Sequence, residues 1–219
     1  MKSRQTMNNF DFMNFSESSF DAIADNLANN GYVIIDNFLS DKETEQLVQL
    51  DEFRNGLLHL RKAGIGQHSD FRINESIRGD YIRWIDKAVA APPLKIYIDR
   101  LNEMMRLINR TLFLSLKDIE LHMTVYPAGA YYKRHLDQFK PGDHRKLSVI
   151  CYLNEGWTAD LGGQLRMYLK GGSEDVLPVA GRLICFRSDN IEHEVLPSKK
   201  ERLSVTGWML DQEADLKHL

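Results

Sequence analysis

Two histidines and one aspartate in this sequence could together hold a metal ion. His135 and Asp137 are separated by a single residue, and His193 follows much later in the chain. On an extended strand, side chains two positions apart point to the same face, so His135 and Asp137 would approach one metal from the same side. Two imidazoles and one carboxylate can hold one face of a ferrous ion and leave the opposite face open. The spacing therefore predicts an iron site, although the His-x-Asp pair by itself also fits a surface turn.

The last strand-like run of the sequence has one polar face, which carries Arg202, Ser204, Thr206 and Trp208. An arginine and two hydroxyls inside a protein are costly unless they meet an anion. A guanidinium suits a carboxylate because it donates two parallel hydrogen bonds to it. We therefore expect Arg202 to receive an anionic co-substrate at the open face of the metal, although a solvated position at the end of the strand is the alternative.

The same alternation on two earlier runs predicts which of their residues face this pocket. One face of the run 146–153 is wholly apolar and belongs in the packing against helices; it carries Leu147, Val149, Cys151 and Leu153. The opposite face leaves Tyr152 directed into the pocket. On the run 120–126, the residues expected to point inwards are His122, Thr124 and Tyr126.

The first half of the chain has the spacing of helices. Apolar periodicity predicts a helix over 18–29 and a second one that begins at Pro92. Ser40 and Glu43 have the spacing of a capping box, which predicts a helix running to about Lys62. These helices are expected to support the β-rich part of the chain that follows.

The segment 64–91 shows no clean period and contains Arg78 and Asp80. A long irregular segment in a compact domain is often a functional flap, and a plain surface loop is the alternative. We expect a mobile loop here.

After about Ser115 the apolar residues alternate with polar ones. Eight strand-like runs are expected, at 120–126, 130–135, 146–153, 163–169, 175–179, 182–186, 191–196 and 202–209. Short strands after a block of helices predict a mainly β fold, a double-stranded β-helix (jelly-roll, cupin-like barrel) packed on N-terminal helices. We divide the chain into a flexible arm (1–17), a helical support region (18–115) and a barrel core (116–212), the last two forming one domain.

Composition limits the classes of function. The 219 residues are 43% hydrophobic and 27% charged, with a formal net charge of −3, which is typical of a globular protein and argues against nucleic acid as a partner. No apolar run approaches the length of a membrane span. Cys151 and Cys185 lie in apolar runs and are interpreted as reduced core residues, which favours a cytoplasmic location.

The sequence resembles the iron(II)- and 2-oxoglutarate-dependent dioxygenases, and more closely the prolyl 4-hydroxylases of the hypoxia-sensing type. The matching stretches occur in the same order as in that family, at 126–137, 152–154, 162–166, 193–195 and 202–208. Arg78, Asp80 and the residues after them also look like the family's substrate-covering loop. Within the family the chain looks like the small bacterial members, whose known target is a proline in elongation factor Tu.

This resemblance implies a role for each matching residue. His135, Asp137 and His193 would bind iron, and Arg202 and Tyr152 would hold the distal carboxylate of 2-oxoglutarate. Tyr126 would lie near the chelating end of 2-oxoglutarate, and Ser204 and Thr206 are expected in the same co-substrate pocket. Arg78, Asp80, Arg145 and Trp208 would contact the peptide. The chain departs from the animal enzymes by a shorter turn between Tyr126 and His135, and by His122 in place of an apolar residue.

The implied reaction consumes dioxygen and 2-oxoglutarate, releases succinate and carbon dioxide, and hydroxylates C4 of a bound prolyl residue. Ascorbate is an expected accessory. Because imidazoles bind metal only when neutral, we expect metal binding to fail below about pH 6.

Three alternatives to a protein prolyl hydroxylase remain at this point. The same chemistry could act on a small molecule, although the long segment 64–91 favours a protein substrate. A cupin-like metal- or sugar-binding module without catalysis is the second, but a passive metal site has no need of Arg202 and Tyr152. The third is an oxygen sensor that binds a regulatory partner and turns over slowly.

Overall fold

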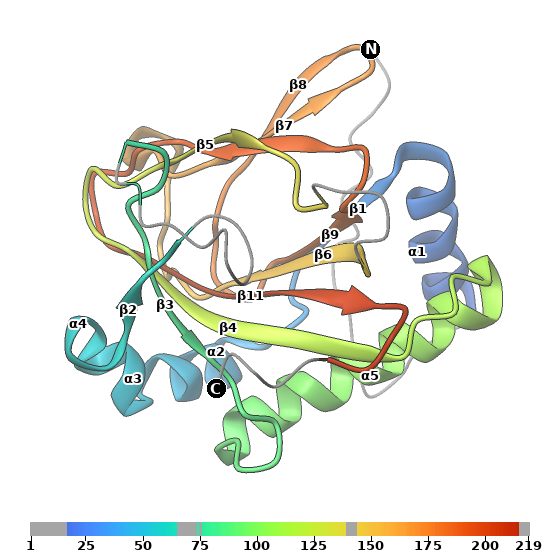
Figure 1. Ribbon diagram of the computed structural model, residues 1–219, viewed down its shortest axis with the longest axis horizontal. Helices are drawn as coiled ribbons and strands as arrows, with labels where there is room; N and C mark the ends of the chain where they lie inside the picture. The colour runs from blue at the N-terminus through green and yellow to red at the C-terminus, as the bar shows by residue number, and fades with distance from the viewer. Residues whose placement is uncertain (1–16, 65–73, 75, 139–143, 215–219) are drawn as a thin grey trace.

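The strands of the computed structural model form two facing antiparallel sheets (Figure 1), and the structure describes residues 17–64, 74, 76–138 and 144–214. In order across the larger sheet lie β1 (Tyr32–Ile35), β9 (Leu183–Arg187), β6 (Arg145–Tyr152), β11 (Arg202–Leu210), β4 (Asp118–Tyr126), β3 (Tyr81–Trp84) and β2 (Arg61–Lys62). In order across the smaller sheet lie β5 (Tyr132–His135), β10 (Glu192–Val195), β7 (Leu165–Leu169) and β8 (Gly172–Val176). This arrangement confirms the expected double-stranded β-helix.

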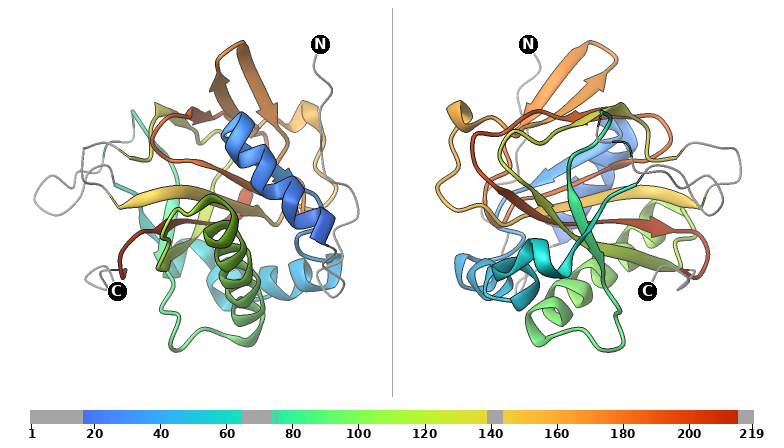
Figure 2. Two further views of the ribbon diagram at one scale, coloured as in Figure 1. Left: turned by 90° about the vertical axis from the view of Figure 1, so that its right-hand side faces the viewer. Right: turned by 60° about the vertical axis from the view of Figure 1, so that its left-hand side comes forward.

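The helices cover the outer face of the larger sheet (Figures 1 and 2). They are α1 (Glu17–Asn30), α2 (Asp41–Val48), α3 (Asp51–Arg54), α4 (Gly56–His59) and α5 (Pro92–Leu112). A short 3-10 turn, η2 (Ala159–Leu161), lies in the barrel half of the described chain. The longest of them, α5, begins with two prolines and buries one stripe of apolar side chains under the sheet.

The two faces of the larger sheet pack into two separate hydrophobic cores. Val149 and Cys151 of β6 point towards the helices and pack with residues such as Leu101. Ile150 and Tyr152, the alternate residues of the same strand, point into the space between the two sheets. The alternation predicted for this strand is therefore confirmed, and both cysteines are buried and free.

The helix expected from Ser40 to about Lys62 is wrong in its length. The capping box is present, because Glu43 N–H donates to the Ser40 side chain and the Glu43 carboxylate accepts from Ser40 N–H. The helix then ends at Val48 and is followed by α3, α4 and the edge strand β2. Leu50 has extended backbone angles, and Arg61 and Lys62 pair with β3 instead of continuing a helix. Pairing with the sheet overrides local helix propensity here.

Smaller differences concern the strands and the two segments expected to be mobile. β8 spans Gly172–Val176 rather than 175–179, because the strand starts directly at the Gly171-Gly172 turn. The end of segment 64–91 contains β3, which pairs with β4 and is part of the larger sheet. Residues 65–73 and 75 of that segment lie outside the described residues, as does the arm expected at 1–17 except for its last residue.

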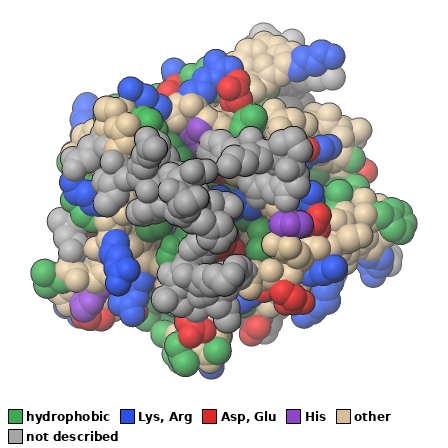
Figure 3. Space-filling model, in the orientation of Figure 1, with side chains coloured by type: hydrophobic (Ala, Val, Ile, Leu, Met, Phe, Trp, Pro, Cys, Tyr) green, Lys and Arg blue, Asp and Glu red, His purple; other side chains and the backbone are tan. Residues whose placement is uncertain are grey.

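The helices and the surface charges of the described residues bear on the kinds of partner that the molecule could meet. Among the described residues, no helix combines the length and the apolar content needed to cross a bilayer. On the face shown in Figure 3, basic and acidic side chains are interspersed rather than gathered into a continuous field of one sign.

Gly207 provides a test of the central strand pairing. A Cβ at this position of β11 would lie 2.0 Å from the backbone oxygen of Glu120 in β4, a contact that only backbone movement can relieve. We expect Gly207→Ala to lower the free energy of unfolding by about 1–3 kcal/mol or more. Gly171→Ala is the matched control, because a Cβ there meets no heavy atom within 4 Å. Urea unfolding of both variants measures the effect, and equal stability would contradict the close β4–β11 approach.

Candidate active site

The two predicted metal-binding histidines lie opposite each other in the smaller sheet. His135 of β5 and His193 of β10 are direct register partners, and their ring centroids are 4.3 Å apart. The Nε2 atom of His135 is 3.5 Å from Asp137 Oδ1, and that of His193 is 3.7 Å from Asp137 Oδ2. One ligand atom from each residue lies within 4.8 Å of the other two. The three side chains are therefore grouped closely enough to bind one ion.

Backbone carbonyls determine which nitrogen of each histidine is free for a metal. His135 Nδ1 is 2.7 Å from the carbonyl oxygen of Lys133, and His193 Nδ1 is 3.1 Å from that of Ile191. A carbonyl can only accept a hydrogen bond, so Nδ1 carries the proton in both rings. The lone pair of each Nε2 then points towards Asp137, as a metal ligand requires.

Asp137 reaches the site in a way that differs from the expectation. β5 ends at His135, and Asp137 lies in a bend beyond the strand, so strand alternation does not direct its carboxylate. Instead, the Ser148 hydroxyl donates a 2.6 Å hydrogen bond to Asp137 Oδ2. Burial alone would raise the pKa of Asp137, but the two imidazoles and this hydroxyl hold it well below its usual range. The group is a carboxylate, the form that binds a metal.

Arg202 is a buried charged residue of the pocket, with 1% of its surface exposed. Its Nε donates to the carbonyl oxygen of Gly163 at 2.9 Å, and its guanidinium carbon lies 5.0 Å from the ring centroids of both Tyr126 and Tyr152. Arg202 Nη2 and Tyr152 Oη are buried and have no hydrogen-bond partner among the described residues. Burial raises the pKa of Tyr152 to about 12, so its hydroxyl remains a donor. The two unpartnered donors, one on the buried guanidinium and one on the neighbouring tyrosine, fit one carboxylate of a ligand.

One cavity of about 940 Å³ is lined by Asp137 and His193 of the His-Asp-His cluster and by Arg202, and it continues outwards along β3. Among its lining residues are most of the predicted site residues, namely Asp137, His193, Arg202, Tyr126, Thr206, Arg78, Asp80, Arg145 and Trp208. Ser204 is fully buried behind it, with its hydroxyl 3.2 Å from that of Thr206.

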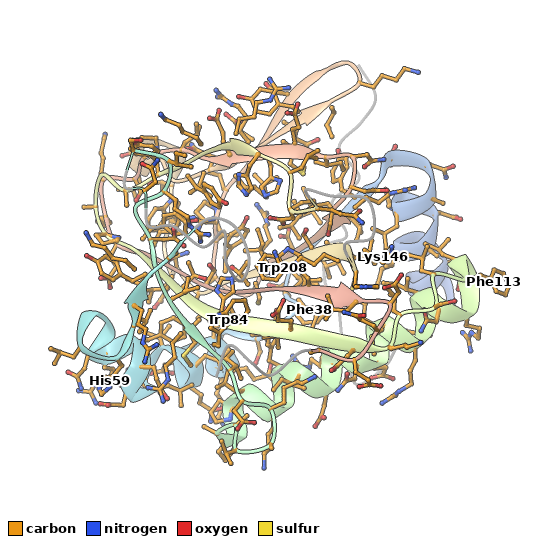
Figure 4. All side chains as sticks on the ribbon, in the orientation of Figure 1. Phe38, His59, Trp84, Phe113, Lys146 and Trp208 are labelled. Carbon is orange, nitrogen blue, oxygen red and sulfur yellow. The ribbon has the colours of Figure 1, made fainter. Side chains whose placement is uncertain are left out.

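Aromatic rings form one wall of this cavity. Trp84 of β3 and Trp208 of β11 lie next to each other near the centre of the molecule (Figure 4), with centroids 6.2 Å apart. The His122 ring lies 5.0 Å from Trp84 and 5.5 Å from Trp208, and its Nδ1 is 2.8 Å from the Thr124 hydroxyl. Arg145 stacks on Trp208 at 3.6 Å. The rings are tilted or edge-on to one another, and the wall presents aromatic surface that suits a ring of a substrate.

The predicted loop residues Arg78 and Asp80 are paired with each other. Arg78 Nε and Nη2 donate to the two carboxylate oxygens of Asp80 at 2.7 and 2.5 Å, and Asp80 is buried. The Arg78 guanidinium also lies 4.3 Å from the ring centroid of Tyr132, which in turn stacks on His135 at 3.6 Å. The loop residues therefore reach a predicted metal ligand through a single aromatic ring.

Comparison with known proteins identifies the family. The model of the 2OG-Fe(II) oxygenase superfamily matches residues 121–210. The human prolyl hydroxylase EGLN3 is 34% identical over 200 residues, which cover 84% of this chain and 80% of the relative. This chain belongs to the 2OG-Fe(II) oxygenase superfamily, in its prolyl hydroxylase branch. Such an oxygenase requires Fe(II), 2-oxoglutarate and dioxygen, and the His-Asp-His cluster and the Arg202 pocket described above fit the first two.

Two solved structures of prolyl hydroxylases share the fold. A prolyl-4-hydroxylase from Pseudomonas putida is 40% identical, with a TM-score of 0.79, and the alignment covers 89% of this chain and all of the other. A prolyl hydroxylase from Trichoplax adhaerens, in complex with a peptide fragment of hypoxia inducible factor, is 29% identical, with a TM-score of 0.78 and coverage of 89% and 90%.

Sequence reasoning assigned no role to two residues that contact the predicted metal ligands: Tyr132 stacks on His135, and Ser148 donates a hydrogen bond to Asp137. The resemblance places Trp84 in the covering-loop segment, whereas the structure places it in β3, in the aromatic wall of the cavity. Ser148 could have been found, because alternation along its strand already placed its hydroxyl on the same face as Tyr152. The roles of Tyr132 and Trp84 depend on contacts between strands, which no local pattern shows.

Burial of His193 leads to a prediction about pH. Burial lowers the pKa of this imidazole to about 4, outweighing the opposite effect of Asp137. His193 should therefore stay neutral well below the pH 6 limit expected for ordinary histidines. The unfolded chain takes up this proton near pH 6.5, so the metal-free oxygenase should lose stability as the pH falls from about 6.5 to about 4.

Nuclear magnetic resonance of the metal-free protein measures this directly. The ring signal of His193, assigned by its absence from a His193→Gln variant, should titrate close to pH 4. A midpoint near pH 6.5 would show that the imidazole is not desolvated as the structure indicates.

Proposed function

We propose that this protein hydroxylates C4 of a prolyl residue in a protein substrate and converts 2-oxoglutarate and dioxygen into succinate and carbon dioxide. The observation that carries the proposal is the unpartnered Nη2 of buried Arg202, a residue that lines the same cavity as Asp137 and His193. The unpartnered hydroxyl of Tyr152 belongs to a ring whose centroid lies 5.0 Å from the Arg202 guanidinium carbon. A buried cation with free donors needs a carboxylate, and 2-oxoglutarate presents one at the end opposite its metal-chelating group. The prolyl hydroxylase relatives support the same reaction.

The chain's own residues orient the reactants. His135 and His193 would offer neutral Nε2 atoms, and Asp137 an ionised carboxylate, to one face of the metal. Bound ferrous iron would supply the oxidative chemistry, which protein side chains cannot perform. Arg202 and Tyr152 would hold the distal carboxylate of 2-oxoglutarate, with Tyr126 packed against the Arg202 guanidinium.

The substrate is assigned to the outer part of the cavity. Trp208 and Trp84 would pack against the prolyl ring and keep bulk water from the metal. Arg145, Arg78 and Asp80 line the same cavity and would contact the peptide on either side of the proline. Thr206 lines the cavity, and the Ser204 hydroxyl lies 3.2 Å behind the Thr206 hydroxyl, so that both would complete the co-substrate pocket.

Elongation factor Tu is the candidate substrate, on the strength of the sequence resemblance to small bacterial prolyl hydroxylases. A cavity of about 940 Å³ that continues along β3 is larger than 2-oxoglutarate and one small molecule require, which favours an extended peptide. The structure of the Trichoplax relative holds a protein-derived peptide. We also infer a cytoplasmic location, where elongation factor Tu works and where free cysteines such as Cys151 and Cys185 persist.

Removing the guanidinium separates co-substrate binding from metal binding. We expect Arg202→Ala to bind 2-oxoglutarate at least about 100-fold more weakly, because the carboxylate loses its charge-assisted contact with the buried guanidinium. Metal affinity should stay within about twofold, since Arg202 touches none of the three predicted ligands. Isothermal titration of 2-oxoglutarate into manganese-loaded protein measures the first quantity. Arg54→Ala, which removes an exposed arginine from α3, is the matched control. Full 2-oxoglutarate affinity in Arg202→Ala would refute the assignment.

The substrate proposal is tested by measuring succinate production by the iron-loaded protein with and without bacterial elongation factor Tu. We expect turnover to rise when the factor is present, and one proline of the factor to gain the mass of a single oxygen atom. Succinate formation that is indifferent to the factor would exclude this substrate. No succinate from protein shown to contain iron would favour the non-catalytic binding module.

A further inference from the structure

Asp137 is the one predicted metal ligand that no strand holds in place. His135 and His193 lie on paired strands, and each ring is fixed by a backbone carbonyl. Asp137 follows the end of β5 and is in a bend. A carboxylate on an unpaired segment can rotate, and it can bind a metal through one oxygen or through both. Something else must determine its orientation.

Two buried serines determine the orientation of the Asp137 carboxylate. Ser148 Oγ donates to Asp137 Oδ2 at 2.6 Å, and its distance to Ser188 Oγ is 2.8 Å. A hydroxyl has one proton, and an ionised carboxylate can only accept. The Ser148 proton therefore goes to Asp137, and Ser188 must donate to Ser148. The three groups form a directed chain of hydrogen bonds, from Ser188 through Ser148 to the carboxylate.

The backbone of Ser188 holds the same segment at a second point. Its carbonyl oxygen accepts a 3.0 Å hydrogen bond from the N–H of Gln138, the residue after Asp137. Its own N–H donates at 3.1 Å to the carbonyl of Lys146 in β6, the strand that carries Ser148. The residue just past β9 thus fixes both the main chain and, through Ser148, the side chain of the Asp137 bend.

Water does not compete with this chain of hydrogen bonds. Ser148 is 1% exposed and Ser188 is fully buried. Both donors are neutral, so they orient the carboxylate without neutralising the charge that a metal needs. A lysine or arginine in the place of Ser148 would pair with Asp137 and compete with the ion.

We propose that Ser148, oriented by Ser188, is a positioning residue that holds the Asp137 carboxylate in the orientation that a metal bound by the His-Asp-His cluster would need. The Ser148 hydroxyl fixes Oδ2 through a 2.6 Å hydrogen bond, so the carboxylate is not free to rotate away from the two histidines. This inference rests on the metal site of the proposed function and deepens it.

Cobalt(II) substitution tests the inference without any turnover. We expect Ser148→Ala to bind Co²⁺ about 10- to 100-fold more weakly, as loss of a partner of a ligand usually does, and to change the visible absorption of the bound ion as coordination changes. Ser148→Thr keeps the hydroxyl and should restore both the affinity and the absorption. Ser188→Ala should reduce Co²⁺ affinity by an intermediate factor. Ser148 can still donate to Asp137 in this variant, but it no longer receives the hydrogen bond that orients its hydroxyl.

Ser198→Ala is the control for removal of a buried serine hydroxyl, because Ser198 bonds only to the carbonyl of Lys200 through its side chain. Its cobalt affinity and absorption should match the unaltered protein. If Ser148→Ala also matches the unaltered protein in both readouts, the positioning role is overturned. Because the readout needs no catalysis, the inference can hold even if the protein makes no succinate, and it can fail while hydroxylation is confirmed.

Discussion

The buried guanidinium of Arg202 is the constraint on which the rest of the structure depends. A cation with 1% of its surface exposed has lost its hydration, and the surrounding protein must compensate. Here one carbonyl accepts from Nε, and two tyrosine rings lie 5.0 Å from the guanidinium carbon. These contacts leave Nη2 unpartnered, so the pocket is complete only with an anion. Gly163, whose carbonyl accepts from Arg202 Nε, has to be a glycine to lie this close to the arginine side chain. A Cβ there would lie 3.3 Å from Arg202 Cδ and 3.0 Å from Ser198 Cβ.

The pairing of β4, β11 and β6 in the larger sheet places Arg202 next to Tyr126 and Tyr152, in the cavity that Asp137 and His193 also line. Arg202 lies opposite Tyr126, and Ser204 lies opposite both Thr124 and Tyr152. Their alternate residues face the helices, so the strands present polar groups on one side and apolar groups on the other. The contacts from Asp80 through Arg78 and Tyr132 to His135 then connect the predicted loop residues to the cluster.

Strand alternation explains how much of this could be predicted from sequence. It placed Tyr152 and Arg202 in the interior correctly, because a side-chain period of two holds wherever a strand is paired on both edges. It failed for Asp137, because β5 ends two residues earlier and a hydrogen bond from the Ser148 hydroxyl directs the carboxylate instead. The capping box at Ser40 marked the start of α2, but nothing local showed that Arg61 and Lys62 would pair with β3. The Tyr132–His135 stack and the Trp84–Trp208 contact join residues from different strands, so only the fold reveals them.

The most direct test of the account is a titration of 2-oxoglutarate into the ferrous protein without oxygen, followed by visible absorption. Chelation of ferrous iron by the keto acid produces a charge-transfer absorption that neither component has alone. We expect this absorption to appear and to saturate at one 2-oxoglutarate per protein chain. Protein that holds iron but develops no such absorption would contradict the claim that the His-Asp-His cluster and Arg202 form one co-substrate site.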